Sequence, residues 1–241
     1  MPKILGHRGM GAGYGENSLL SLIKAVQIGA DGVETDVWLT EDSTMVLTHD
    51  PELEKVTGEN LHVKETSYKY LKRKGYINEE LLTTLEMLYL ELPDTSLINV
   101  ELKDTEAAHV VGQLVNSFGA LERTIFSSFQ HECLEVLKKN VPDAHIGLLI
   151  DERAKTDDPL KYFKDLVSSY NPYSLHLPVQ MFEEVGLDEG IRVIDFFRQW
   201  EVRILLWTLN DPDLALKVKD HCDYIVTDNI SQILAVFGGK S

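Results

Sequence analysis

One pattern recurs along most of this chain: a short apolar strand followed by an amphipathic helix. Hydrophobic periodicity predicts nine strand-like runs, one of which is the return arm of a β-hairpin. The other eight are each followed by a helix, and eight strand–helix units in 241 residues are typical of a (β/α)₈ TIM barrel. A doubly wound open sheet is the alternative, although it usually has fewer strands. The expected strands after the hairpin cover residues 97–102, 124–128, 145–150, 173–177, 202–208 and 223–227.

Helix starts are also marked in the sequence. Asp158-Pro159 and Asp211-Pro212 each combine a capping residue with proline at the first helical position. Asn17 is expected to cap the first helix, which should stop at Gly29. A capping-box pattern over residues 83–86 predicts another helix that ends near residue 93.

The β-hairpin is expected where two apolar-alternating runs, Val33–Leu39 and Met45–Thr48, flank a polar turn. A two-residue loop at Asp42-Ser43 would fix the pairing of the two strands. Serine tolerates positive φ less well than glycine, so a longer loop, which would shift the register, remains an alternative.

With the two-residue loop, Val37 faces Thr48, and Asp36 faces His49. Side chains alternate along a strand, so Glu34 shares the face of Asp36. The hairpin would then hold two carboxylates and a histidine in one place, which is an active-site arrangement.

Regular periodicity lapses between residues 51 and 82, which we interpret as an insert over one end of the barrel, with a short helix near residues 67–73. Its basic residues are expected to form a solvated face rather than a ligand site: Lys64, Lys69, Lys72, Arg73 and Lys74. We expect residues 1–241 to form a single barrel domain that includes this insert.

Composition limits the possible partners. With 44% hydrophobic and 26% charged residues, the chain has the balance of a globular protein. The net charge of −16 argues against nonspecific nucleic-acid binding, which needs an electropositive face. No apolar run reaches the eighteen residues of a membrane span, and the N-terminus does not resemble a secretory signal. A cytoplasmic location is therefore expected, and nothing in the sequence predicts an oligomeric state.

Polar residues stand at the carboxyl ends of the first three barrel strands, where barrel enzymes build their sites. Glu34 and Asp36 lie on the second strand, and Glu101 lies on the third. Three converging carboxylates need neutralisation, and an all-oxygen ligand set suits a hard divalent cation, Mg²⁺ or Ca²⁺, better than zinc. Arg8 and Lys103 would add positive charge around it.

His7 and His49 have the intrinsic pKa for proton transfer near neutral pH. An acid, a base, a metal and two cations make a set that can cleave phosphoesters, but the same set could serve enolate chemistry. Taken alone, Glu101-Leu102-Lys103 could equally be a buried ion pair.

These residues fall in motifs that closely resemble the glycerophosphodiester phosphodiesterase family, in order and over nearly the whole chain. The motifs are Gly6-His7-Arg8-Gly9, Glu16-Asn17, Glu34-Thr35-Asp36-Val37, His49-Asp50, Glu101-Leu102-Lys103, Ser128-Phe129, Trp207-Thr208-Leu209-Asn210 and Thr227-Asp228. The resemblance implies a metal-dependent (β/α)₈ barrel that hydrolyses glycerophosphodiesters, as small-molecule substrates, to glycerol 3-phosphate and an alcohol.

Carried over by position, the resemblance also implies roles for nine residues. His7 and His49 would be the acid–base pair, Glu34, Asp36 and Glu101 the metal ligands, and Arg8, Lys103, His176 and Trp207 the substrate-binding residues. Trp207 would wall the glycerol side, and His176 falls where some members have a polar site residue.

Three other functions remain in competition. A lysophospholipase D would keep the metal but would need an apolar groove for an acyl chain. A noncatalytic phosphate-binding barrel would need no acid–base pair, so the two histidines speak against it. A barrel lyase or isomerase would need a lysine base on a late strand, and none is evident.

Overall fold

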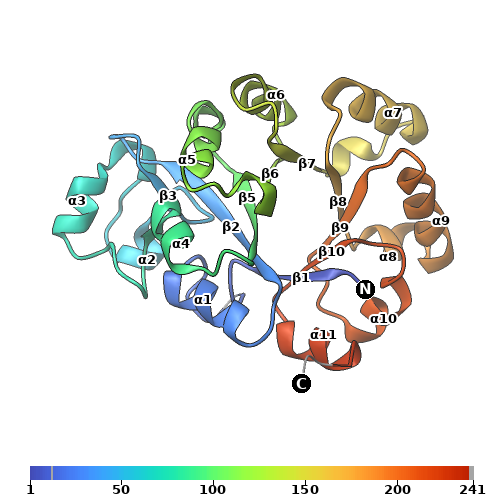
Figure 1. Cartoon of the computed structure of the whole chain (residues 1–241), viewed down its shortest axis with the longest axis horizontal. Helices are drawn as coiled ribbons and strands as arrows, with labels where there is room; N and C mark the ends of the chain where they lie inside the picture. The colour runs from blue at the N-terminus through green and yellow to red at the C-terminus, as the bar shows by residue number, and fades with distance from the viewer. Residues whose placement is uncertain (12, 239–241) are drawn as a thin grey trace.

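The computed structural model describes residues 1–11 and 13–238; residues 12 and 239–241 of the expected domain lie outside the described part (Figure 1). Its centre is a closed barrel of parallel strands in which each strand pairs with two neighbours and β1 pairs with both β2 and β10. The barrel strands are β1 (Lys3–His7), β2 (Gly32–Leu39), β5 (Leu97–Leu102), β6 (Thr124–Ser128), β7 (His145–Leu149), β8 (Ser174–Pro178), β9 (Arg203–Trp207) and β10 (Tyr224–Thr227). The predicted TIM barrel is confirmed.

Helices surround the strands (Figure 1). They are α1 (Leu19–Gln27), α4 (Leu85–Glu91), α5 (Val111–Ser117), α6 (His131–Asn140), α7 (Pro159–Tyr170), α8 (Met181–Val185), α9 (Leu187–Arg198), α10 (Pro212–Val218) and α11 (Ile230–Val236). Asp158 caps α7 and Asp211 caps α10, as predicted. The prediction for Asn17 is wrong, because Ser18 caps α1 and Asn17 turns inward with a φ of 59°.

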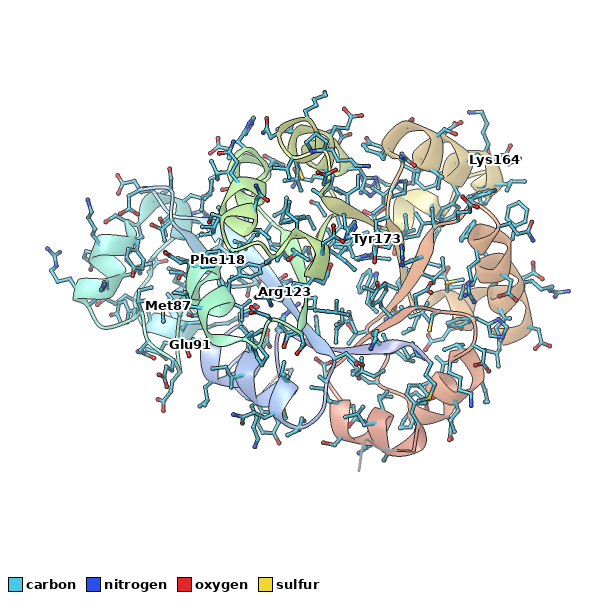
Figure 2. The ribbon with its side chains drawn as sticks, in the orientation of Figure 1. Met87, Glu91, Phe118, Arg123, Lys164 and Tyr173 are labelled. Atoms are coloured by element: carbon cyan, nitrogen blue, oxygen red, sulfur yellow. The ribbon has the colours of Figure 1, made fainter. Side chains whose placement is uncertain are left out.

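The main core contains apolar side chains from both the barrel strands and the helices around them. Figure 2 shows the side chains that fill the space between these two layers. The packing of this core includes Tyr89 of α4, which stacks on Phe118 at 5.7 Å and lies 5.3 Å from the Arg123 guanidinium. A second, smaller cluster includes Leu5, Ile125 and Leu205, on three of the barrel strands. Burying each such aliphatic side chain contributes about 1.5–3 kcal/mol, so the core can support a polar site at the strand ends.

The hairpin strand β3 (Met45–Leu47) pairs with β2 in a register one residue away from the predicted one. Val37 lies opposite Leu47 rather than Thr48, and the Thr48 amide donates to the Asp36 carbonyl at 3.1 Å. Asp36 therefore does not face His49, and that part of the prediction is wrong.

The physical reason is a three-residue loop. The Thr40 amide donates to the Thr44 carbonyl, and the Ser43 amide donates to the Thr40 carbonyl, both at 2.9 Å. Ser43 has a φ of 62°, in the left-handed region. A turn completed by one left-handed residue adds a residue to the loop, so the register shifts by one.

The insert follows the hairpin and contains α2 (Glu54–Thr57) and α3 (Tyr68–Arg73), with a short strand β4 (Thr83–Thr84) at its end that pairs with β3. It lies to one side of the barrel (Figure 1). A separate apolar cluster that includes Val46, Leu53 and Leu71 holds it, and Trp38 packs against that cluster. Its basic side chains are exposed, as expected. Across the described residues, no helix has both the length and the apolar character needed to cross a membrane.

Candidate active site

Three carboxylates converge at the carboxyl ends of β2 and β5. The two strands are parallel neighbours in a register that places Asp36 beside Glu101. One oxygen from each of Glu34, Asp36 and Glu101 lies within 4.8 Å of the others. Glu34 and Asp36 are buried, and Glu101 is nearly so. A cluster of this geometry could hold a divalent metal ion.

Arg8 and Lys103 balance part of this charge. The Arg8 Nε lies 3.2 Å from Asp36 Oδ2, and the Arg8 backbone amide donates to Glu34 Oε2 at 3.0 Å. The Lys103 ammonium lies 2.6 Å from Glu101 Oε1 and 3.3 Å from Asp36 Oδ1. Two cations against three carboxylates leave an excess of negative charge.

That excess appears in the acid–base properties of the carboxyl groups. Burial, followed by the charge of Asp36, raises the pKa of Glu34 to about 8. The same two causes raise the pKa of Glu101 to about 7. A bound divalent cation would remove this penalty by supplying the missing positive charge.

The donor set fits a hard cation. Asp36 Oδ1 is buried and forms a loose ion pair with the Lys103 ammonium at 3.3 Å, so this oxygen can also coordinate a cation. The cluster offers only carboxylate oxygens, which Mg²⁺ and Ca²⁺ prefer.

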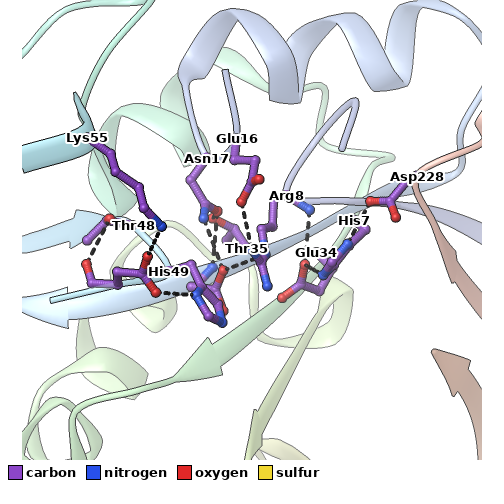
Figure 3. A network of polar contacts seen from close by, with 12 residues as sticks. His7, Arg8, Glu16, Asn17, Glu34, Thr35, Thr48, His49, Lys55 and Asp228 are labelled. Carbon is purple, nitrogen blue, oxygen red and sulfur yellow. Dashed lines mark hydrogen bonds and ion pairs between the residues drawn. The ribbon is translucent and has the colours of Figure 1, made fainter. Parts of the chain in front are cut away.

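His7, at the end of β1, lies beside this cluster. Its Nδ1 is 2.7 Å from Asp228 Oδ1, and its Nε2 is 4.0 Å from Glu34 Oε2 (Figure 3). An ionised carboxylate can only accept, so Nδ1 carries the proton and Nε2 is turned toward the carboxylates. Burial alone would lower the pKa of His7, but the Asp228 hydrogen bond and the Glu34 charge raise it above its usual value.

His49 reaches the site from the segment that follows β3. Its Nδ1 lies 2.8 Å from Asp50 Oδ1, and the other oxygen of Asp50 accepts from Lys55 at 2.9 Å. Trp38 donates from its indole nitrogen to the His49 carbonyl at 3.1 Å, which ties this segment to β2. Both histidines therefore have a carboxylate on Nδ1, although His49 does not occupy the register predicted for it.

A cavity of about 150 Å³ opens at this end of the barrel. Eight of the nine predicted site residues line it: His7, Arg8, Glu34, His49, Glu101, Lys103, His176 and Trp207. Asp36, the ninth, contacts Arg8 and Lys103, which both line the cavity.

His176 and Trp207 form the side of the cavity away from the insert. His176 is fully buried, and burial lowers its pKa to about 3, so its ring is neutral at physiological pH. Trp207 donates to the His176 carbonyl at 3.1 Å and meets the Phe129 ring edge-on, with centroids 5.7 Å apart. Phe129 also lines the cavity, although the sequence assigned it no role.

The structure adds Asn17 to the residues around the cluster. Its side-chain amide donates to Asp36 Oδ2 at 3.0 Å, and its Oδ1 accepts from the Thr35 hydroxyl and from the Asp36 amide (Figure 3). Asn17 has a left-handed backbone conformation, which asparagine tolerates better than most residues. An asparagine at this position was therefore the feature of the sequence that could have indicated this conformation.

A closed (β/α)₈ barrel with carboxylates and cations at its strand ends and two oriented histidines beside them has the architecture of a barrel enzyme. Residues 7–232 match the Glycerophosphoryl diester phosphodiesterase family. A glycerophosphodiester phosphodiesterase of Bacillus altitudinis is 32% identical over 187 residues, which cover 71% of this chain and 76% of that protein. A second glycerophosphodiester phosphodiesterase, from Caldanaerobacter subterraneus, is 27% identical over 246 residues, which cover 94% of this chain and 93% of that protein.

Solved structures agree. The crystal structure of a glycerophosphodiester phosphodiesterase from Thermotoga maritima superposes with a TM-score of 0.84 and 33% identity, covering 98% of each chain. This chain therefore belongs to the glycerophosphoryl diester phosphodiesterase family, and it is a hydrolase of that kind. The family resemblance predicted from the motifs is confirmed.

Proposed function

We propose that this protein hydrolyses glycerophosphodiesters to glycerol 3-phosphate and an alcohol, using Mg²⁺ or Ca²⁺ and two histidines. The observation that carries the proposal is that His7 and His49 line the same cavity as Glu34 and Glu101, which together with Asp36 form a cluster of three carboxylates. Its curated relatives from Bacillus altitudinis and Caldanaerobacter subterraneus carry the same activity in their names.

Glu34, Asp36 and Glu101 would hold the cation, which when bound supplies positive charge to the nonbridging phosphate oxygens. Arg8 and Lys103 line the same cavity, so their charges would face a phosphate bound there. Such fixed charges stabilise the transition state because they need no reorganisation as negative charge develops. Together with the bound cation, they would outweigh the three carboxylates and give an anionic substrate a local attraction that the net charge of −16 does not.

Proton transfer falls to the two histidines. Phosphodiester cleavage needs a proton removed from the nucleophile and a proton given to the leaving alkoxide. Nδ1 of each histidine is hydrogen-bonded to a carboxylate, Asp228 for His7 and Asp50 for His49, which leaves Nε2 of each ring to exchange a proton with the substrate. His7 lies at the end of β1 and His49 in the segment after β3, so they approach the cavity from different parts of the chain and would act on opposite sides of one phosphate.

Trp207 and Phe129 give the cavity an aromatic wall that can pack against the carbon atoms of glycerol. His176, neutral and buried beside them, adds a polar group without adding charge. This wall supports a glycerol-binding role for Trp207 and His176.

A substrate panel tests the proposal. Glycerophosphocholine, glycerophosphoethanolamine and lysophosphatidylcholine would be incubated with the enzyme and Mg²⁺ or Ca²⁺, and the products identified by mass spectrometry. We expect glycerol 3-phosphate with the free alcohol from the first two. Release of phosphocholine instead, turnover restricted to lysophosphatidylcholine, or binding of all three without turnover would contradict it.

A further inference from the structure

His7 and His49 each bind a carboxylate through Nδ1, but the residues that hold these two carboxylates differ. We propose that Asn210 is a positioning residue that fixes the orientation and tautomer of His7 through Asp228. The inference rests on the proposed function, in which His7 exchanges a proton at Nε2.

Asp228 has a separate partner for each carboxylate oxygen. Its Oδ1 accepts from His7 Nδ1 at 2.7 Å, and its Oδ2 accepts from Asn210 Nδ2 at 2.8 Å. The Asp228 backbone amide also donates to Asn210 Oδ1 at 2.8 Å. Both ends of the Asn210 amide therefore bind the same residue, so the Asp228 carboxylate cannot rotate without breaking a hydrogen bond.

Asn210 is itself held in place. Its Oδ1 also accepts from the Thr227 hydroxyl at 3.0 Å, and its backbone carbonyl accepts from Asn229 Nδ2 at 3.3 Å. Asn210 follows β9 and Asp228 follows β10, which are neighbours in the barrel, and β10 in turn pairs with β1, which carries His7. Three consecutive strands thus position one imidazole.

Gly11, in the loop that follows β1, also restricts where the Asp228 carboxylate can lie. A Cβ atom added at Gly11 would lie 2.6 Å from Asp228 Oδ1 and 2.7 Å from its Cβ. Gly11 also has a φ of 78°, which favours glycine. Gly11, His7 and Asn210 therefore border the carboxylate on three sides, and its side chain stays 32% exposed.

The second histidine lacks such a support. The partner of His49 is Asp50, whose Oδ2 accepts a hydrogen bond from Lys55. The Lys55 side chain is 85% exposed. An exposed lysine samples many rotamers, whereas the short amide of Asn210 is fixed by several hydrogen bonds. The expected consequence is that His7 depends on its supporting residues for its tautomer.

Kinetics of Asn210→Ala would test this, with Asn210→Ser as a second variant that retains a polar group. Supporting residues of this kind typically change activity by about 10–100-fold. We expect kcat to fall by about that factor, while KM and the affinity for Mg²⁺ change little. Asp211→Ala is the matched control, because Asp211 lies in the same loop and its side chain caps α10 by accepting from the backbone amides of Asp213 and Leu214. It should lower the melting temperature and leave kcat unchanged.

A double-mutant cycle separates positioning from general damage. In a His7→Ala background, Asn210→Ala should produce no further loss of kcat. A loss as large as in the wild type would overturn the proposal, because Asn210 would then act independently of His7.

The tautomer gives a readout that does not depend on the substrate. In ¹⁵N-labelled protein, long-range ¹H–¹⁵N spectra, assigned by comparison with His7→Ala, should show His7 protonated at Nδ1 in the wild type and a mixture of tautomers in Asn210→Ala and Asn210→Ser. Unchanged spectra in both variants would overturn the positioning role. Absence of glycerophosphodiester turnover in the wild type would instead count against the proposed function alone.

Discussion

Metal affinity should rise steeply between pH 6 and pH 8. A carboxyl group must lose its proton before it can bind a cation, so protons and metal compete for the same oxygens. Burial and the neighbouring Asp36 charge raise the pKa of Glu34 to about 8 and that of Glu101 to about 7. The competition therefore falls in a range where affinity is easily measured.

The magnitude follows from these two pKa values. Each pH unit below a pKa weakens binding about tenfold, so at pH 6 Glu34 and Glu101 together weaken it by about 10³. At pH 8 the same competition amounts to only about twofold. The dissociation constant for Mg²⁺ or Ca²⁺ should therefore fall by about 10²–10³ between the two pH values.

Isothermal titration calorimetry at pH 6, 7 and 8, in buffers of different ionisation enthalpy, would give the affinity and the protons released per ion. Glu34→Gln is the matched variant, because it removes the group with the highest of these pKa values and should flatten the pH dependence. An affinity that does not change with pH, with no proton release, would show that protons do not compete with the cation at this site. It would mean that these carboxylates are already ionised or are not ligands.

The remaining predictions concern four single substitutions. His7→Ala and His49→Ala should each lower kcat for glycerophosphocholine by about 10²–10⁴ with metal affinity nearly unchanged, and wild-type turnover in either variant would make that histidine structural. Asn17→Ala removes the amide donor to Asp36 and should weaken metal binding by about 10–100-fold in calorimetry; equal affinity would show that Asp36 needs no such support. Ser43→Gly relieves a left-handed φ and should raise the free energy of unfolding in urea by up to about 1 kcal/mol, whereas a decrease would contradict the three-residue loop.

Much of the barrel could be predicted because its strands are buried on both faces. The predicted bounds of β5 and β6 agree with the structure to the residue, because polar residues follow the apolar run near the carboxyl end of each strand. The grouping of Glu34, Asp36 and Glu101 could also be predicted. Side chains alternate along each strand, and β2 and β5 are parallel neighbours, so these carboxylates lie on the same face at the same end of the barrel.

The errors arise where one backbone angle or a distant partner decides the outcome. The hairpin register depends on the φ of Ser43, and serine carries no strong signal for that conformation. The strand β4 has only two residues and is defined by its pairing with β3. Asn17 is a plausible helix cap by local rules, and its bond to Asp36 exists only because α1 packs beside β2. Local sequence cannot report such long-range contacts.

Hydrolysis should require a cation held by Glu34, Asp36 and Glu101. The most direct test measures release of glycerol 3-phosphate from glycerophosphocholine by exhaustively chelated enzyme, before and after addition of Mg²⁺ or Ca²⁺, alongside Glu101→Gln. We expect no turnover in chelator and recovery with metal in the wild type. Glu101→Gln should lose both activity and metal binding, with the fold retained by circular dichroism. Full activity in chelator, or a fully active Glu101→Gln enzyme, would show that hydrolysis does not need a cation at these carboxylates.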